Sequence, residues 1–456
     1  MLLVSKVRPG GGRYYLEPTG AFGAPAVEAE GYWIGRRRAA FGLSRAVDPL
    51  ELEAVLEGRH PVGGDDLGAD RRRVQVAAFD LTFCAPKSVS LLFALGDGDI
   101  ASAVGEGHAR AVAAAMSYVE DRALAVRRTE PAVGRVPAAV EAVPAAGFLH
   151  RTSRALDPHL HTHVVVPNLG RARDGTWSAL DSRGIYAHAG AAGALYHAQL
   201  RHELSASLGV DWGPLVGGRA DVAGVGEEAR QAFSRRSAEI AAHLEGRGLD
   251  RREDRPSPRA ATVAALATRA DKNPTVSVAE LRPSWHERAR AAGLGPRRIE
   301  AVLGRVPARV LCDEGPVASL PGPDLELTTA LALTRPAETR FARRHAVRAW
   351  AASRGRGAPA AGVEERVDVF LASPAVVDAH PGSGHLDGPG VAERSCALSE
   401  EVRGHFLERL GHQREARSLD ELLRRRGMSL GLDAPRSPAP GTALELGTSI
   451  GIGMGR

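Results

Sequence analysis

The chain has 456 residues, of which 44% are hydrophobic, so it can form two or three domains with a sizeable core. Its net charge of +5 and pI of about 9.4 favour a nucleic-acid partner only weakly, because abundant Ala, Gly, Pro and Arg also indicate a coding bias. Its three cysteines, which form no CxxC pair, argue against a disulfide framework and a cysteine zinc cluster. No apolar run approaches ~18–20 residues, so we expect no membrane insertion and a cytoplasmic location.

Local sequence patterns predict both strands and helices along the chain. Strands are expected at residues 1–7, 74–83, 139–145, 147–151, 161–166 and 176–179, with a short β region at 210–223. Helices are expected at residues 48–56, 86–95, 100–128, 185–208, 227–245, 260–271 and 277–294.

A cluster of prolines between residues 304 and 326 indicates the main domain boundary. We therefore expect a first domain at residues 1–304 and a linker at 305–330. Two short helical patterns predict a helical region within residues 331–432. The tail at 433–456 is rich in glycine and proline, which predicts disorder.

The most informative stretch, residues 148–167, holds four of the sixteen histidines: His150, His159, His161 and His163. On a strand, His161 and His163 point to the same face, which is the geometry of a metal site. Strand parity alone adds His159 as the third ligand. Pro158, however, favours a turn position for His159, and a hairpin through residues 157–158 would instead bring His150 alongside. The spacing leaves both sets open.

Two further features could complete a reaction site. Asp80 lies within an apolar strand pattern, where a carboxylate needs either an arginine partner or a metal-binding histidine that it orients. Tyr14 and Tyr15 are adjacent in a chain with few aromatic residues. They could be one packed ring and one exposed ring on a surface turn, or they could supply a nucleophilic phenol. A phenol beside a three-histidine ion suits phosphodiester transfer, since the ion neutralises the phosphate oxygens.

Candidate phosphate contacts are few. Lys87 opens a predicted helix, where free N–H groups also favour phosphate, although a solvated lysine is an equal alternative. Arg36, Arg37 and Arg38 form a basic run that is more typical of a solvated face. Arg154 is a further candidate in the histidine-rich stretch.

Two catalytic motifs narrow the range of possible functions. The chain contains no Gly-x-x-x-x-Gly-Lys-Ser/Thr loop, so nothing indicates a P-loop motor. The single Gly-x-Ser-x-Gly match, at residues 447–451, lacks room for the helix that a nucleophile elbow must open, and we interpret it as a chance match.

Five segments together resemble the conjugative relaxases of the TrwC/TraI kind (MobF class). They are FDLTFCAPKSVS (79–90), FLHRTSR (148–154), DPHLHTH (157–163), LYHAQLRHEL (195–204) and FSRRSAEI (233–240). They occur in the family's order within about residues 1–300.

The resemblance implies an α+β fold with an antiparallel sheet flanked by helices, the HUH relaxase-like palm. It implies that His150, His161 and His163 bind a divalent cation, with Mg²⁺ or Mn²⁺ foremost and Zn²⁺ or Ni²⁺ also able to occupy the site. Asp80 matches the aspartate that supports a metal histidine and the nucleophile. Tyr14 would be the nucleophile, with Tyr15 its neighbour.

The function that this resemblance implies is site- and strand-specific DNA nicking and joining through a 5′-phosphotyrosine. The partners would be single-stranded or hairpin DNA at an origin of transfer, accessory relaxosome proteins and a coupling protein. Residues 331–432 resemble a truncated lead-in to a helicase. The chain has one tyrosine pair where such relaxases often have two, which puts a second strand transfer by one polypeptide in doubt.

Three alternatives stay open at this point. A rolling-circle replication initiator would use the same chemistry, and genomic neighbourhood would separate it. A non-catalytic DNA-binding remnant would form no covalent adduct. A three-histidine hydrolase using metal-bound water would need no tyrosine.

Overall fold

The computed structural model describes residues 2–12, 15, 31–43, 46–67, 75–130, 134–247, 263–264, 267–268, 277–304, 340–379 and 395–398. All of these belong to one compact unit, Met1–Ser399. The expected linker at 305–330 and the tail at 433–456 lie outside the described residues, as does most of the helix expected at 260–271.

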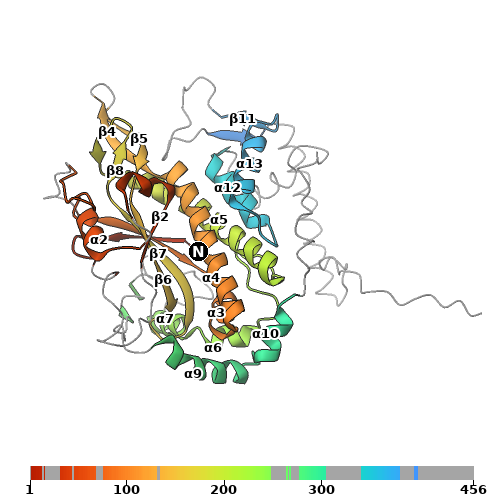
Figure 1. Cartoon of the computed structure of the whole chain (residues 1–456). Coiled ribbons are helices and arrows are strands. Elements are labelled where there is room, and N and C mark those ends of the chain that lie inside the picture. Colours follow the sequence, from red (N-terminus) through yellow and green to blue (C-terminus); the bar gives the residue numbers. More distant parts are fainter. Residues whose placement is uncertain are drawn as a thin grey trace, which may run out of the picture. The chain divides into compact units, whose positions relative to one another are not determined.

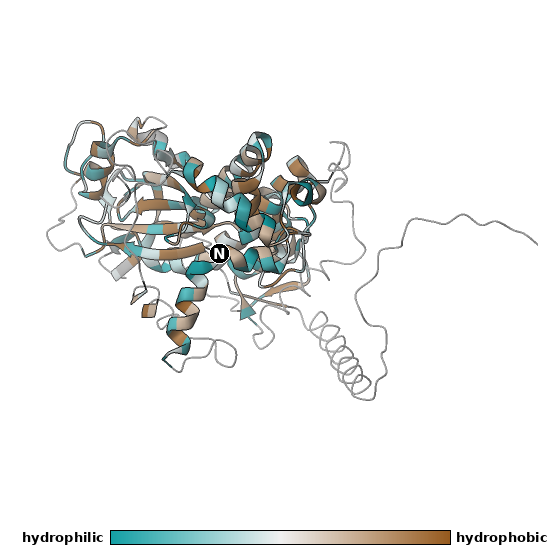
Figure 2. Cartoon of the chain, turned by 90° about the horizontal axis from the view of Figure 1, so that it is seen from below, coloured by the Kyte–Doolittle hydropathy of each residue, from teal (hydrophilic) through white to brown (hydrophobic). Residues whose placement is uncertain are grey.

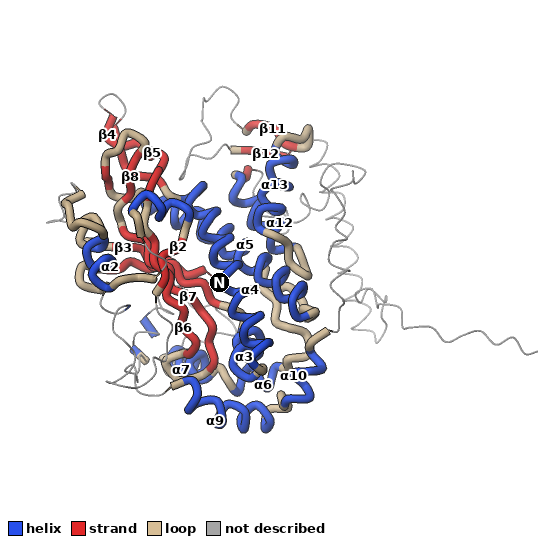
Figure 3. Tube along the Cα trace, viewed as in Figure 1, coloured by secondary structure: helices blue, strands red, loops and turns tan. Residues whose placement is uncertain are grey.

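The central element is a five-stranded sheet with the order β1-β3-β7-β6-β2, and every pairing in it is antiparallel. Its strands are β1 (Leu2–Val7), β2 (Tyr32–Ile34), β3 (Ala78–Cys84), β6 (Ala145–Thr152) and β7 (Pro158–Pro167). Helices lie on both sides of this sheet (Figures 1 and 3). The predicted α+β class, an antiparallel sheet flanked by helices, is confirmed.

One face of the sheet packs on two long helices. These are α4 (Gly98–Tyr118), which follows α3 (Lys87–Leu95), and α5 (Ser182–Leu208). Each helix is capped by an aspartate whose carboxylate accepts a hydrogen bond from a main-chain N–H of the first turn. The capping residue is Asp97 for α4 and Asp181 for α5. Helix α5 ends at Gly209, whose φ of 61° is the left-handed conformation that glycine adopts most easily. In Figure 2 apolar residues recur along the strands, whereas the helices carry alternating apolar and polar stripes.

On the opposite face of the sheet, the described residues place one helix at one end. Helix α2 (Pro49–Leu56), capped by Asp48, packs on one end of it. The apolar cluster at this end consists of Val7, Trp33, Leu52, Val55, Leu56, Ala78, Ala146, Phe148 and Val165. Tyr15 packs against this cluster. Further along the same face lie the histidines described below, so the core ends where the polar residues begin.

The predicted helix at 100–128 is too long by its last turns. Helix α4 ends at Tyr118, a single π turn follows (Val119–Ala123, η3), and β4 (Ala125–Glu130) begins. Strand β4 pairs with β5 (Gly134–Ala142) in a second sheet of order β4-β5-β8-β9, with β8 (Gly170–Ala172) and β9 (Trp177–Ser178). The prediction was wrong because cross-strand pairing overrides the local helical pattern.

Three other expectations differ from the structure. The strand expected at 139–145 is the end of β5 and the start of β6, separated at Pro144, which has no N–H for a ladder. The β region expected at 210–223 forms only isolated bridges. The helix expected at 227–245 is two helices, α6 (Glu227–Ala232) and α7 (Arg235–Glu245), because the N–H of Arg235 donates to the buried Asp157 carboxylate instead of continuing a helix.

Helices support the tip of the β6–β7 hairpin. Asp157 is 1% exposed and pairs with Arg235 of α7 and with Arg288 of α9 (Val278–Ala291). The indole N–H of Trp285 donates to the main-chain oxygen of Leu156. Helix α10 (Pro296–Val302) follows α9. The hairpin tip is therefore held by charged and aromatic side chains that are more than 70 residues away in the sequence.

A further layer packs on α5 from the side away from the central sheet (Figure 1). It contains α12 (Arg343–Ser353), α13 (Ala360–Leu371) and a small sheet of order β10-β12-β11. Its strands are β10 (Arg340–Phe341), β11 (Val376–Asp378) and β12 (Cys396–Leu398). Among the described helices, none is long and apolar enough to cross a bilayer.

Candidate metal centre and active site

Three histidines converge on this face of the sheet. His150 of β6 pairs directly with His161 of β7, and His163 follows two residues along β7, so all three side chains lie on one face. One ligand atom from each lies within 4.8 Å of the others. His159 is outside this group, although its ring centroid is 4.5 Å from that of His161. The histidines that converge are therefore His150, His161 and His163, the set that the resemblance implied, and not the alternative set with His159.

The protonation of His161 and the orientation of His161 and His163 suit metal binding. Burial, together with the neighbouring His163, lowers the pKa of His161 to about 4, so that this imidazole is neutral at ordinary pH. Its Nδ1 lies 2.8 Å from the main-chain oxygen of His159, which directs Nε2 toward the cluster. His163 is held in the same way, with Nδ1 2.8 Å from a carboxylate oxygen of Asp80. Nitrogen donors oriented by second partners fit a divalent metal ion.

Asp80 links the histidines to a tyrosine. It is 5% exposed, and its carboxylate accepts from the hydroxyl of Tyr15 at 2.8 Å and from the hydroxyl of Thr82 at 3.1 Å. The same carboxylate binds Nδ1 of His163, which Thr82 also approaches at 3.1 Å. The register explains the meeting, since Thr82 lies opposite His163 and Asp80 is one pleat away on the same face. One carboxylate thus orients a phenol and a metal-binding imidazole together.

The tyrosine pair is described in part. Tyr15 rests on Phe148, with ring centroids 5.4 Å apart, and meets His163 edge-on at 5.8 Å. Its hydroxyl is therefore beside the histidine cluster. Tyr14, the expected nucleophile, lies outside the described residues.

The candidate phosphate contacts are scattered. Lys87 begins α3 and donates from Nζ to the main-chain oxygen of Pro158 at 2.8 Å; burial lowers its pKa to about 8. Arg154 lies half-buried in the turn between β6 and β7. The other three lie on a short 3-10 helix, Arg36–Phe41 (η1), where Arg36 pairs with Asp121 and Arg38 donates to the oxygen of Gly35. The side chain of Arg37 is outside the described residues.

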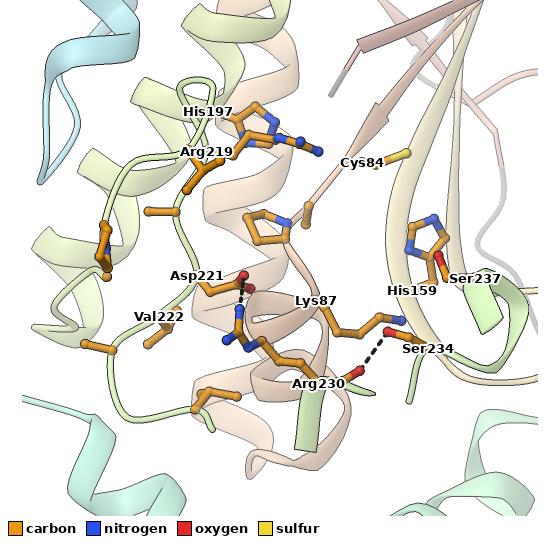
Figure 4. A pocket seen from close by; sticks show the side chains of 18 of the residues that line it. Cys84, Lys87, His159, His197, Arg219, Asp221, Val222, Arg230, Ser234 and Ser237 are labelled. Carbon is orange, nitrogen blue, oxygen red and sulfur yellow. Dashed lines mark hydrogen bonds and ion pairs between the residues drawn. The ribbon is translucent and has the colours of Figure 1, made fainter. Parts of the chain in front are cut away.

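A pocket of about 1100 Å³ adjoins the histidine cluster. Cys84, which pairs with His161 in the sheet, and His159 both line it, so the pocket continues the same face of the sheet. Lys87 and His159 lie on one side of it, and the ion pair of Asp221 with Arg230 faces them (Figure 4).

Much of this pocket wall consists of residues that no sequence motif indicated. His197 of α5 is 4% exposed and contributes to the lining, as does Arg219. Burial lowers the pKa of His197 well below its usual value, and the charges of arginines such as Arg201 and Arg219 add to this effect. No local pattern marked these residues, because they come from a helix and a loop that meet only in the folded chain.

A buried polar network supports β7 from the other face. His108 of α4, which is 1% exposed, lies 2.8 Å from the Thr162 hydroxyl and 2.9 Å from the Tyr196 hydroxyl of α5. Thr162 stands between His161 and His163 and points away from them. Burial lowers the pKa of His108 to about 3, so it is a neutral ring that bridges two helices to the strand carrying the histidines.

An antiparallel sheet that bears three convergent histidines, with an aspartate and a tyrosine beside them, defines the relaxase type of fold and site. The chain belongs to the TrwC relaxase family, whose family model matches residues 4–292. The family that the sequence motifs predicted is thus confirmed.

Known relatives agree with this assignment. The multifunctional conjugation protein TraI of Escherichia coli strain K12 is 33% identical over 354 residues, which cover 73% of this chain and 18% of the relative. A metal-free structure titled as conjugative relaxase TrwC in complex with oriT DNA is 30% identical, with a TM-score of 0.56, and the match covers 64% of this chain and 99% of that one. A metal-bound structure of that complex is 29% identical, with a TM-score of 0.56 and the same coverage. The chain thus spans less than a fifth of the length of the curated relative.

Proposed function

We propose that this protein nicks and rejoins one DNA strand at a plasmid-type origin of transfer, through a tyrosine linked to the 5′ phosphate. The observation that carries the proposal is the chain of hydrogen bonds from Tyr15 to Asp80 to His163, at the edge of the three-histidine cluster. The similar TrwC structures support the substrate, since one is titled as a complex with a 27-mer DNA comprising the recognition hairpin and the cleavage site.

His150, His161 and His163 would hold a divalent cation. When bound, the cation neutralises the non-bridging oxygens of the scissile phosphate. Imidazole nitrogens suit Zn²⁺ and Ni²⁺ best and suit Mg²⁺, which prefers oxygen ligands, least, with Mn²⁺ between them. We therefore propose Mn²⁺ ahead of Mg²⁺, with Zn²⁺ and Ni²⁺ as competitors for the site.

The residues of the chain divide the reaction between them. The phenol oxygen forms a bond to phosphorus, the bond from phosphorus to the 3′ oxygen breaks, and that oxygen leaves as a hydroxyl after taking up a proton. If Tyr15 is the attacking residue, Asp80 is placed to receive the proton of its phenol, because the carboxylate already accepts the hydrogen bond of that hydroxyl. Rejoining runs the same steps backwards, with the 3′ hydroxyl as the attacking group.

The nucleophile is a member of the Tyr14–Tyr15 pair. The resemblance favours Tyr14, whereas the hydrogen bond to Asp80 supports Tyr15. Peptide mapping of the covalent adduct decides between them, because only the peptide residue that bears the nucleotide changes in mass. We expect the phenylalanine variant of the nucleophile to form no adduct, and the other variant to retain it.

The DNA would approach along the sheet face that carries the histidines. The pocket beside the cluster can take a single strand, with the charges of Lys87 and Arg219 against its phosphates. Arg154 and the basic residues of η1 (Arg36, Arg37 and Arg38) remain candidate contacts to more distant phosphates. Accessory relaxosome proteins, a coupling protein and a cytoplasmic location remain part of the proposal.

A denaturing gel tests the proposal directly. We expect an origin oligonucleotide to give a protein–DNA band that survives denaturation, disappears with chelator and returns with Mn²⁺ or Mg²⁺. Cleavage without a covalent band would replace this function with metal-activated water hydrolysis. Hairpin binding without any cleavage would identify a DNA-binding remnant.

A further inference from the structure

Arg201 of α5 is a buried cation that the proposed reaction does not use. It is 2% exposed, and its hydrogen bonds go to main-chain carbonyls in two other segments. Its guanidinium donates to the oxygens of Ala351 and Arg354 at 3.1 and 2.9 Å, and to the oxygen of Gly218 at 3.0 Å. Burial lowers its pKa to about 10, so the side chain stays charged at neutral pH.

The first two acceptors lie at the end of α12. Ala351 is within the last turn of this helix and Arg354 is its C-cap. Carbonyls at a helix end have no partner within the helix and carry its partial negative charge. The guanidinium of Arg201 satisfies them, which explains how a buried arginine is tolerated there.

The third acceptor belongs to residues 213–225, the pocket loop, which form one wall of the pocket. Gly218 lies among the lining residues Val216 and Arg219, and its φ of 79° requires glycine. A Cβ at Gly218 would come within 2.8 Å of the Cβ of Ala352, so the loop backbone lies directly on α12. One side chain therefore joins the pocket loop to the end of α12.

The segment after α12 strengthens the same contact. Gly357 lies so close to α5 that a Cβ on it would be 2.2 Å from the oxygen of Ala198. The N–H of Ala360 donates to the side-chain oxygen of Gln199 at 2.7 Å. These contacts are made by the two residues that follow His197, which lines the pocket, so residues 354–360 pack on the α5 turn that contributes this wall.

We propose that α12 and residues 354–360 are a structural support of the DNA pocket, and that Arg201 is the positioning residue that transmits this support to loop 213–225. The supporting segment lies beyond residues 4–292, the range that the family model matches. A region that resembles a helicase lead-in thus acquires a role in single-strand binding. This role rests on the proposed function of the pocket.

The test compares full-length Arg201→Met with a matched control, Arg343→Met. Arg343 is the first residue of α12, at the helix end opposite to the one that Arg201 contacts, and it pairs with Asp368 and Glu364 of α13. Amide hydrogen exchange of loop 213–225 is measured without DNA. Affinity is then measured for a single-stranded oligonucleotide that extends past the nick site. Gly218→Ala serves as a second variant, which disturbs the loop contact while the arginine stays in place.

We expect Arg201→Met and Gly218→Ala to increase exchange in loop 213–225 and to weaken oligonucleotide binding about tenfold, on the order of one lost buried hydrogen bond to a charged group. Arg343→Met should leave both measurements near wild type. Unchanged loop exchange in a folded Arg201→Met protein overturns the support. Faster loop exchange with unchanged oligonucleotide affinity overturns the link to DNA. If the wild type binds no oligonucleotide, the proposed function fails, while the exchange comparison still decides whether Arg201 holds the loop.

Discussion

Replacing Asp80 by asparagine keeps the volume of the side chain but removes the carboxylate that orients its neighbours. The carboxylate accepts from three donors: Tyr15, Thr82 and the Nδ1–H of His163. Asparagine offers one acceptor oxygen and one NH₂ group. At least one of the three donors must therefore face an NH₂ group.

The expected magnitude follows from the tautomer of His163. When NH₂ faces Nδ1, the ring is stabilised with its proton on Nε2, the atom that must bind the ion. Loss of such a supporting partner typically weakens metal affinity about 10- to 100-fold, or roughly 1.4–2.7 kcal/mol. Adduct formation should fall further, because Asp80 also holds the hydroxyl of Tyr15.

The assay is a competition titration of Mn²⁺ or Zn²⁺ against a fluorescent chelator, without DNA. Asp221→Asn is the control, since Asp221 is a hydrogen-bonded carboxylate paired with Arg230 beside the pocket and outside the histidine cluster. We expect the control to bind the ion as the wild type does. Wild-type ion affinity in Asp80→Asn would refute the argument that this carboxylate sets the tautomer of His163.

Three other outcomes are expected. His108→Phe removes a hydrogen-bond partner of two buried hydroxyls, so in denaturation and ion-titration experiments it should lower the free energy of unfolding by about 2–4 kcal/mol and weaken ion binding. The control His188→Phe, which breaks a similar buried contact with Tyr118, should lower the free energy of unfolding but leave ion binding unchanged. Equal ion affinities of the two variants would contradict this expectation. The folded-state pKa values of His108 and His161, about 3 and about 4, lie below the usual 6.5. The stability that these two neutral rings contribute is therefore fully present above pH 6.5, and it is lost as the pH falls from 6.5 toward the folded-state values. Urea unfolding in chelator should show a loss of up to about 1.4 kcal/mol per pH unit for each ring, and a flat profile would exclude neutral buried histidines. Lys87, with a pKa of about 8, should lose its charge as pH rises through that value, so oligonucleotide affinity should fall there in the wild type but not in Lys87→Gln.

The local elements show how far pattern reasoning reaches in this chain. The strand at the N-terminus and the helices α2, α3 and α5 were predicted within a few residues, because caps, glycine stops and apolar spacing are local signals. Strand β4 was predicted as helix, since its alanines and arginines favour a helix until β5 pairs with it. Helices α6 and α7 were merged, because the break depends on Asp157, about 80 residues away.

The sequence by itself determined that the histidine-rich strand would present His161 and His163 on one face, because side chains alternate along a strand. It also placed Asp80 on a strand that needed a polar partner. Motif resemblance, and not spacing, selected His150 over His159. Only the tertiary structure put Asp80 between Tyr15 and His163, and only it brought Arg201 against both α12 and the pocket loop. These contacts depend on strand register and on burial between segments far apart in the chain, and neither leaves a periodic signal in the residues themselves.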